Sequence, residues 1–234
     1  MRTTPPILTP RLQQIADKIQ PCACVADIGT DHAYLPVFLC MTQKAEKAIA
    51  SDIRKGPIAR AEATILRYGM QRQVETRLGG GADTLQVGEA DCIVIAGMGG
   101  LMIAEILKEN PAIFAQAGQI LLQPMTAVFE LRTYLFEHGY TILEETLAKE
   151  EEKLYHILSV TAAREEAEPT EEELYFGKTL MANKPEHFDA YIQKQRRKLT
   201  RMAEGLQNSQ TPDAQTRFKQ VQSLLDAIKG ENLC

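Results

Sequence analysis

The sequence predicts an α/β fold: a mostly parallel sheet that ends in an antiparallel hairpin, followed by a C-terminal α-helical hairpin. Between residues 24 and 137, short apolar runs alternate with helical patterns, as in βα units. Two further apolar runs follow with no helix-length segment between them, which favours an antiparallel pair at the sheet edge. Beyond Arg164 no strand pattern remains. We therefore expect one domain over residues 1–163 and a helical domain over residues 164–234.

The first expected element is a helix that begins at Thr9-Pro10, because proline is favoured at the first helical position. Apolar residues then recur on one face as far as Ile19. Arg11 falls in the first turn, where a cation gains nothing from the helix dipole. A solvated surface arginine is the simplest interpretation of this residue.

Five short apolar strands follow this helix, and four of them are followed by a segment with apolar residues at helical spacing. The expected strands are Cys24–Ile28, Lys47–Ser51, Val74–Leu78, Asp91–Ala96 and Gln119–Gln123, the last ended by Pro124. The expected helices are Tyr34–Thr42, Pro57–Gly69, Leu101–Leu107 and Val128–Glu137. The closing hairpin is expected at Tyr140–Leu147 and Tyr155–Thr161. This order is the layout of class I methyltransferases, a Rossmann-like fold, rather than the symmetric double unit of dehydrogenases.

The C-terminal part begins after a charged link, Glu165–Pro169. Helical patterns follow at Glu171–Met181, Glu186–Leu206 and Asp213–Ile228. A turn at Asn208–Pro212 separates the last two. An antiparallel helical hairpin is therefore the economical arrangement.

The composition is that of a soluble globular protein, with 44% hydrophobic residues and a net charge of −5. The N-terminus has no apolar segment typical of a signal peptide and no window resembles a membrane span, so a cytoplasmic protein is expected. The five cysteines are scattered and odd in number, and Cys22-Ala-Cys24 lacks the two-residue spacer of redox and zinc sites. We expect reduced thiols that serve packing, and no metal site. No oligomeric state is predicted.

The strand-turn-helix at Val25–Pro36 is where we expect a nucleotide-like ligand. Asp27 and Gly29 form an abbreviated nucleotide turn, and Asp52 ends the next strand, where a carboxylate can accept both hydroxyls of a ribose. The spacing favours a cofactor that contains adenosine. The alternative is structural: Asp27 caps a turn and Asp52 caps the following helix.

Two further groups lie near this turn in the predicted fold. The glycines of Gly97–Gly100 end an apolar strand and would let a ligand approach the backbone, although an ordinary tight turn remains an alternative. Asp31, His32 and Tyr34 follow the nucleotide turn and would lie beside the reactive end of the cofactor. His32 can move a proton near neutral pH or can simply bond to backbone at the start of the helix.

Three segments together resemble one family. Asp27–Pro36, Ala96–Gly100 and Leu122–Pro124 look like the motifs of the bacterial tRNA adenine-22 N1-methyltransferases, the TrmK family. The similarity extends from Arg11 to about Ala162. It implies an enzyme that uses S-adenosylmethionine to methylate N1 of an adenine in the D-arm region of tRNA. It also implies a class I methyltransferase domain with a C-terminal coiled coil.

The resemblance assigns roles to residues that match the family motifs. Asp27 and Gly29 would hold the methionine portion of the cofactor, and Asp52 its ribose. Gly97 and Met98 would border the methyl group and the target base. The base pocket would be lined by Gln123 and Pro124.

The sequence departs from the family pattern at two places. Gly79-Gly80-Gly81 stands where Gly-Asp-Gly is expected, so the carboxylate that contacts the cofactor's adenine amino group is absent unless Asp83 replaces it. Met125 stands where Asn is expected after Leu-Gln-Pro, which removes a polar group from the base pocket.

Methyl transfer to adenine N1 requires positioning more than base catalysis, because N1 already carries a lone pair. The product ring is cationic, so Asp31 is expected to stabilise the developing charge, while His32 or solvent takes the N6 proton. Tyr34 is a candidate for stacking on an exposed target base, with burial in the core as the alternative.

One dense basic cluster lies in the C-terminal part. On a helix these residues cover a face that can contact tRNA phosphates, although a solvated helical face has the same composition. The residues of this cluster are Lys194, Arg196, Arg197, Lys198 and Arg201. Together with Arg11 they are the candidate tRNA contacts outside the base pocket.

Three alternatives to a tRNA methyltransferase remain. One is a methyltransferase for a small molecule or a protein, in which the basic cluster is incidental. A second is a catalytically silent binding protein, to which Gly80 and Met125 lend slight support. A dehydrogenase is the third, and the closing hairpin argues against it.

Overall fold

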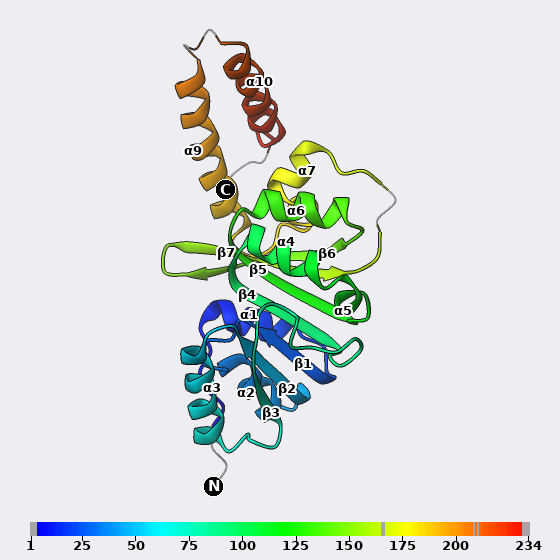
Figure 1. The fold of residues 1–234 in the computed structure, drawn as a ribbon. Helices are drawn as coiled ribbons and strands as arrows, with labels where there is room; N and C mark the ends of the chain where they lie inside the picture. Colours follow the sequence, from blue (N-terminus) through cyan, green and yellow to red (C-terminus); the bar gives the residue numbers. More distant parts are fainter. Residues whose placement is uncertain (1–3, 165–166, 208, 210, 231–234) are drawn as a thin grey trace. The chain divides into compact units, whose positions relative to one another are not determined.

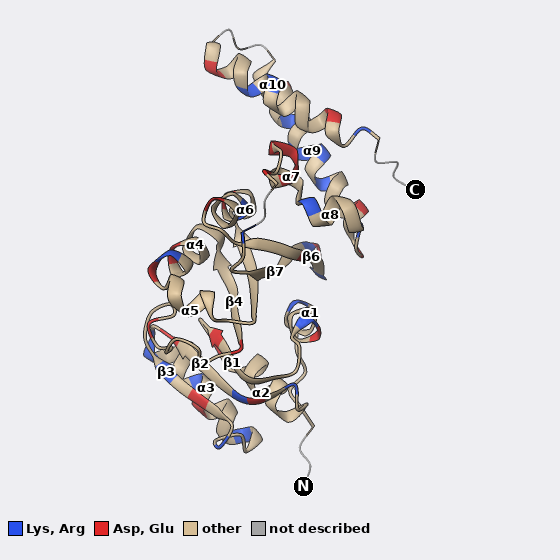
Figure 2. Cartoon of the chain, turned by 90° about the vertical axis from the view of Figure 1, so that its right-hand side faces the viewer, with Lys and Arg blue, Asp and Glu red and all other residues tan. Residues whose placement is uncertain are grey.

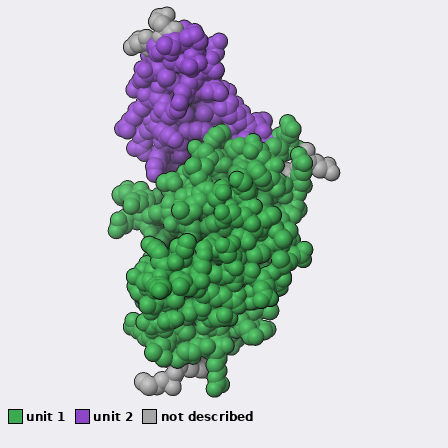
Figure 3. Space-filling view, viewed as in Figure 1, with its two compact units in different colours: residues 1–168 green, residues 169–234 purple. Residues whose placement is uncertain are grey.

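The computed structural model describes residues 4–164, 167–207, 209 and 211–230. The chain divides into two compact units, residues 1–168 and residues 169–234 (Figure 3). Among the described residues, the first unit contains the sheet and the helices that pack on it. The second contains helices alone in the part of it that the structure describes.

The sheet has seven strands in the order β3-β2-β1-β4-β5-β7-β6 (Figure 1). The strands are β1 Cys22–Ile28, β2 Ala45–Asp52, β3 Val74–Leu78, β4 Cys92–Gly99, β5 Gln119–Thr126, β6 Thr141–Glu150 and β7 Lys153–Thr161. All neighbours from β3 to β5 are parallel, whereas β7 pairs antiparallel with both β5 and β6. The predicted class I methyltransferase layout with its terminal hairpin is therefore confirmed.

Helices cover both faces of this sheet. They are α1 Pro10–Lys18, α2 Tyr34–Met41, α3 Lys55–Tyr68, α4 Gly100–Glu109, α5 Pro111–Ala115 and α6 Val128–Glu137. Alternate residues of β4 point to opposite faces: Ile93 and Ile95 join the core under α4 and α6, while Val94 joins the core under α1, α2 and α3. Burial on both faces explains why the central strands read as continuous apolar runs.

Helix α1 is fixed at both ends. The Thr9 hydroxyl accepts a hydrogen bond from the Leu12 N–H at its start. At its end the Lys44 ammonium donates to the carbonyls of Ala16 (2.6 Å) and Asp17 (3.2 Å), groups that a helix terminus leaves unpaired. The first turn of α1, which carries Arg11, is thereby held in a defined place.

Several boundaries differ from the sequence prediction for identifiable reasons. Strand β5 does not end at Pro124 but continues to Thr126, because the β4–β5 register shifts around Met98 and such an irregularity tolerates a proline. The short helix α5 was not predicted. The helix expected over Glu171–Met181 is two helices, since Gly177 adopts φ +93°, which no continuous helix accommodates.

The helices of the second unit are α7 Glu171–Phe176, α8 Lys178–Asn183, α9 Phe188–Leu206 and α10 Pro212–Ala227. A capping box fixes the start of α7, where Thr170 and Glu173 each accept the other's backbone N–H. Helices α9 and α10 pack side by side, as the predicted hairpin requires. The predicted turn includes Asn208 and Gln210, and the predicted link includes Glu165 and Glu166; these four lie outside the described residues.

A buried ion pair joins α6 to β6. Arg132 donates to both carboxylate oxygens of Glu145, at 3.0 and 2.6 Å, and both side chains are almost fully buried. Burial alone would raise the pKa of Glu145, but Arg132 and His156 outweigh it and lower this pKa to about 2. The pair therefore stays charged and fixes the orientation of the hairpin that follows α6.

Candidate active site

A cavity of about 400 Å³ opens at the carboxyl edge of the sheet. Its walls come from the turn after β1, from the first turn of α1, and from the ends of β4 and β5. Seven of the residues predicted from sequence line it: Arg11, Asp27, Gly29, Asp31, His32, Tyr34 and Gly97. Ligands of open α/β sheets bind at this edge.

The turn after β1 is held against the end of β2. Gly29 adopts φ +80°, and the N–H groups of Gly29 and Thr30 both donate to the Ser51 carbonyl at 2.8 Å. Glycine adopts this conformation without the steric cost that a Cβ atom brings. The turn therefore exposes backbone and the Asp27 carboxylate to the cavity.

Asp27 is buried at the end of β1 and lines the cavity. Burial raises the pKa of Asp27 to about 6, and a hydrogen bond from the Thr30 side chain opposes the rise. No cation faces the carboxylate at hydrogen-bond distance among the described residues. A buried carboxylate without such a partner is suited to a cationic ligand.

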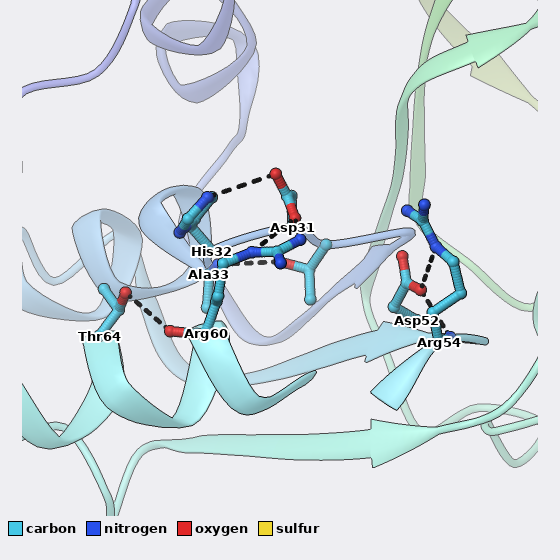
Figure 4. A network of polar contacts seen from close by, with 8 residues as sticks. Asp31, His32, Ala33, Asp52, Arg54, Arg60 and Thr64 are labelled. Carbon is cyan, nitrogen blue, oxygen red and sulfur yellow. Dashed lines mark hydrogen bonds and ion pairs between the residues drawn. The ribbon is translucent and has the colours of Figure 1, made fainter. Parts of the chain in front are cut away.

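Asp31 is engaged by its neighbours (Figure 4). Arg60, on α3, donates to it through Nε at 3.1 Å and also through Nη2, and His32 Nε2 lies 3.3 Å from its second oxygen. The hydrogen bond from Arg60 holds the pKa of Asp31 below its usual value. The carboxylate is therefore ionised but already paired. Sequence alone missed Arg60, which is 29 positions away along the chain from Asp31.

His32 and Tyr34 form one edge of the cavity. Their rings stack with centroids 5.3 Å apart and planes 12° apart. Tyr34 is 37% exposed, so it is not a core residue, and its ring is accessible from the cavity. No hydrogen bond joins His32 to the backbone among the described residues, which removes support for the backbone-bonding alternative.

Gln123 lies beneath the cavity, 1% exposed, with its amide fully engaged. Its oxygen accepts from the Gly97 N–H (3.0 Å) and from Arg11 Nη1 (2.6 Å), and its nitrogen donates to the Pro124 carbonyl (3.0 Å). Gly97 sits at φ +77° in the irregular part of β4. Gln123 therefore holds the backbone of Gly97 and the Arg11 guanidinium in place, while Gly97 and Arg11 face the cavity.

Arg11 is not the solvated surface residue that its position in α1 favoured. Its side chain is 21% exposed and lies over the Tyr155 ring, with the guanidinium carbon 5.3 Å from the ring centroid. Its backbone N–H donates to Glu150 at 2.9 Å. Arg11 is partly buried because β6 and β7 pack against α1. Helix periodicity does not reveal this contact, since the segments are distant in sequence.

The glycines that end β4 serve two purposes. Gly97 faces the cavity, as a ligand-contacting glycine would. A Cβ atom on Gly100 would lie 2.8 Å from the Thr126 carbonyl oxygen and still nearer that of Ala127, so Gly100 is required by close packing of the chain. Met98 packs against the core on the α4 side and over Gly29, and it does not line the cavity.

Asp52 ends β2 and is buried, with its side chain 7% exposed. Its Oδ1 accepts from the backbone N–H of Arg54 at 2.7 Å and from Arg54 Nε at 3.3 Å. Asp52 therefore closes a turn before α3, but it does not cap the helix as the structural alternative expected, because the N-cap is Arg54 and no side chain caps α3. Its other oxygen, Oδ2, receives no hydrogen bond within the described residues. Arg54, which lines the cavity, was not singled out by the sequence.

The glycines after β3 begin beside the end of β2, where the Gly79 N–H donates to the Asp52 carbonyl at 3.0 Å. A Cβ atom on Gly80 would lie 3.4 Å from the Ile53 side chain, which is itself 70% exposed. Asp83 is exposed and accepts a hydrogen bond from the Asn110 amide at 3.0 Å. Asp83 does not line the cavity. The region next to Asp52 thus presents backbone and an apolar side chain, both suited to the face of a purine.

Figure 2 shows Lys and Arg positions in blue along α9. The side chains of the basic cluster on this helix lie in two environments. Lys194, Arg197 and Arg201 are exposed. Arg196 instead donates through Nη2 to the Ile228 carbonyl at 2.7 Å, at the end of α10. Lys198 is exposed and its ammonium lies 5.6 Å from the Tyr175 ring centroid. Fewer residues of the cluster are therefore available to a phosphate than the sequence indicates.

Two kinds of feature are absent from the described part of the chain. No helix there combines the length and apolar character that a membrane crossing needs. No group of three or more His, Cys, Asp or Glu side chains there is arranged to hold a metal ion.

Known proteins resemble this chain along most of its length. The family model for a methyltransferase domain matches residues 8–158. The chain is 36% identical over 160 residues to the tRNA (adenine(22)-N(1))-methyltransferase of Bacillus subtilis, an alignment that covers 68% of this chain and 67% of that protein.

Solved structures agree over nearly the whole chain. The Bacillus subtilis m1A22 tRNA methyltransferase TrmK superposes with a TM-score of 0.85 at 29% identity, covering 95% of this chain and 97% of that one. The Streptococcus pneumoniae protein Sp1610, solved in complex with S-adenosyl-L-methionine, superposes with a TM-score of 0.82 at 29% identity, covering 94% and 100%.

Proposed function

The chain belongs to the methyltransferase-domain family and, within it, to the tRNA (adenine(22)-N(1))-methyltransferases, and we infer that it transfers a methyl group from S-adenosylmethionine to N1 of adenine 22 in tRNA. The observation that carries this inference is the meeting of the Gly29 turn of β1 with the Gly97 end of β4 in one cavity. These two motifs also carry the family resemblance.

The cofactor fits the residues present. S-adenosylmethionine, when bound, supplies an electrophilic methyl group on a sulfonium. Its methionine portion carries an ammonium, for which the buried Asp27 carboxylate is an uncompensated partner. Its two ribose hydroxyls match the two carboxylate oxygens of Asp52, of which Oδ2 is open and Oδ1 accepts from Arg54. Its adenine matches the surface of Ile53 and Gly80. We propose Asp27, Asp52, Ile53 and Gly80, with Gly29, as the cofactor contacts.

Adenine N1 attacks with a lone pair it already has, so this chain's task is to position the base and exclude water. A base inside folded tRNA must first be extruded into the cavity. We propose that Tyr34 and the guanidinium of Arg11 border the base, because aromatic rings and guanidinium planes both stack on bases. Gln123 acts through Arg11 and Gly97 as a positioning residue. Pro124 accepts a hydrogen bond from Gln123 and Met98 packs over Gly29, so these two residues are proposed to support the site without lining the cavity.

The positive charge moves from sulfur to the base during transfer. Asp31 is an ionised carboxylate at the cavity and is proposed to stabilise the charge that develops on the ring. Its pairing with Arg60 keeps the carboxylate ionised and oriented, while the positive charge of Arg60 cancels part of the attraction that Asp31 exerts on the ring. His32, beside it, can accept the N6 proton afterwards. An unchanged single-turnover rate in Asp31→Asn would refute the electrostatic role.

The tRNA is proposed to contact the second unit as well as the cavity. Lys194, Arg197 and Arg201 present exposed cations on α9, which can neutralise phosphates. Because the proposed substrate is tRNA, we also propose that the protein works in the cytoplasm. No metal enters the proposed reaction.

The decisive experiment uses labelled S-adenosylmethionine and two tRNA transcripts that differ only at position 22, one with adenosine and one with guanosine. Label is expected on the first transcript alone, and mapping should place it at N1 of that adenosine. Labelling of both transcripts would refute the position, labelling of small molecules or proteins alone would refute the substrate, and tight NAD binding with no methyl transfer would revive the dehydrogenase.

A further inference from the structure

Arg54 is hydrogen-bonded to Asp52, the carboxylate that the proposed function assigns to the cofactor's ribose (Figure 4). Its Nε lies 3.3 Å from Asp52 Oδ1, and its backbone N–H donates to the same oxygen at 2.7 Å. The Arg54 side chain is 72% exposed while that of Asp52 is 7% exposed. The guanidinium therefore lies over a buried carboxylate and faces the cavity on its other side.

The side-chain bond between Arg54 and Asp52 is weak and replaceable. A guanidinium with this much exposure gains little from one long contact, since exposed ion pairs contribute about 0–1 kcal/mol. The backbone bond at 2.7 Å fixes the turn without it. A ribose that donates one hydroxyl to each oxygen of Asp52 takes the open Oδ2 and competes with Arg54 Nε for Oδ1. The backbone bond of Arg54 stays in place.

Once displaced, the Arg54 side chain has no other hydrogen-bond or ion-pair partner among the described residues, although its charge contributes to the lowered pKa of Asp31. The nearby acid, Asp31, is already taken by Arg60 and His32. Arg54 is the N-cap of α3, where the positive end of the helix dipole disfavours a cation. The first turn of α3 also contains no acidic residue that could pair with it. A released guanidinium at the cavity rim is thus available to an anion that arrives from outside.

We propose that Arg54 couples the two substrates: it rests on Asp52 while the cofactor site is empty, and cofactor binding releases it to contact a phosphate of the incoming tRNA. The proposal rests on the proposed function, because it takes the ribose at Asp52 as given. It makes cofactor binding promote tRNA binding through one additional phosphate contact. By linkage, tRNA must promote cofactor binding by the same factor.

The test measures tRNA affinity over a range of salt concentrations, with and without saturating S-adenosylhomocysteine. The proteins are the wild type, Arg54→Gln, Arg54→Lys and the control Arg72→Gln, which removes an exposed arginine away from the cavity. In the wild type the nucleoside is expected to tighten tRNA binding by about fivefold or more. The slope of log K against log salt should steepen by about 0.7–0.9, the value of one phosphate contact.

In Arg54→Gln both the tightening and the change in slope should vanish, whereas Arg72→Gln should keep both. Arg54→Lys should keep the slope change, because it retains a cation. Calorimetry without tRNA should show that Arg54→Gln binds S-adenosylhomocysteine at least as tightly as the wild type, because the competitor for Asp52 is gone.

Three results overturn the coupling: no effect of the nucleoside on tRNA binding in the wild type, an undiminished effect in Arg54→Gln, or a loss of nucleoside affinity above about threefold in that variant. The last would mean that Arg54 holds the cofactor itself. Failure of the proposed function is distinct, because the wild type would then fail to bind the nucleoside, tRNA or both.

Discussion

The terminal methyl group of Met98 packs against Gly29 so closely that a Cβ atom on Gly29 would lie less than 3.0 Å from it. The two residues come from different motifs, the turn after β1 and the end of β4. Gly29 therefore has two reasons to be glycine: its positive φ and the side chain that covers it. The contact joins the proposed cofactor turn to β4, the strand whose end is expected to border the methyl group.

Gly29→Ala is expected to destabilise the protein and weaken S-adenosylhomocysteine binding. The positive φ costs about 1–2 kcal/mol for a residue with a Cβ atom, and the Met98 methyl must also move. Met98→Ala in the same chain removes the collision but not the backbone strain, so the double variant should recover part of the affinity. Denaturant unfolding and calorimetry measure the two effects. Equal affinities for Gly29→Ala and wild type would contradict the role of the turn.

Gln123→Ala is expected to lower the rate of methyl transfer without weakening cofactor binding comparably. The substitution leaves the Gly97 N–H and the Arg11 guanidinium without their acceptor, at a cost of about 1–3 kcal/mol. Arg11→Lys serves as the companion variant, since it keeps the charge but loses the planar group over Tyr155. Single-turnover rates and the KM for tRNA report the effect. A rate unchanged in both variants would contradict the positioning role.

Asp27 should make stability and cofactor affinity depend on pH in opposite directions. Its folded pKa of about 6 lies above the ordinary value of 3.8, so the folded state keeps a proton that the unfolded chain releases. Stability should therefore fall as the pH rises from about 4 to about 6 and then level, by at most about 3 kcal/mol. Asp27→Asn, which stays neutral, should lose this fall.

Cofactor affinity should instead rise with pH across the same window, because the ionised carboxylate is the form that pairs with an ammonium. Calorimetry of S-adenosylhomocysteine binding in buffers of different ionisation enthalpy should detect proton release near pH 6. Binding that is equally tight at pH 5 and pH 7, with no proton released, would show that Asp27 does not face the ammonium.

The succession of strands and helices along the chain could be predicted from the sequence because its determinants are local. Asp27, Gly29 and Asp52 lie at strand ends, where an apolar run stops and a turn residue follows. The terminal hairpin was readable because Tyr140 to Thr161 leaves no room for a helix. The ends of the strands could not be predicted, because they depend on tertiary packing. Strand β5, for example, continues past Pro124 beside the irregular part of β4.

The side-chain partnerships of the site were not readable, because they join residues remote in sequence. Arg60 reaches Asp31 from α3, and Gln123 reaches Arg11 across 112 positions. Arg54 lies two residues after Asp52 and could have been found by asking which donor closes that turn. No spacing rule connects the others.

The exposed cations of α9 should contribute to tRNA affinity and not to cofactor affinity. Arg197→Glu with Arg201→Glu leaves Arg196 intact, which matters because Arg196 donates to the Ile228 carbonyl and its loss would disturb the helix pair. The matched control is Arg217→Glu with Lys219→Glu, an equal charge change at exposed positions on α10.

The α9 variant should bind tRNA at least about tenfold more weakly, with a salt slope shallower by about 0.7–0.9 for each phosphate that the helix no longer neutralises. Unchanged binding of S-adenosylhomocysteine and unchanged helix content would show that the methyltransferase unit and the helix pair remain folded. The control should lose less affinity, because its positions lie outside the basic cluster. If both variants lose the same affinity, net charge alone attracts the tRNA; if neither loses any, α9 does not contact it.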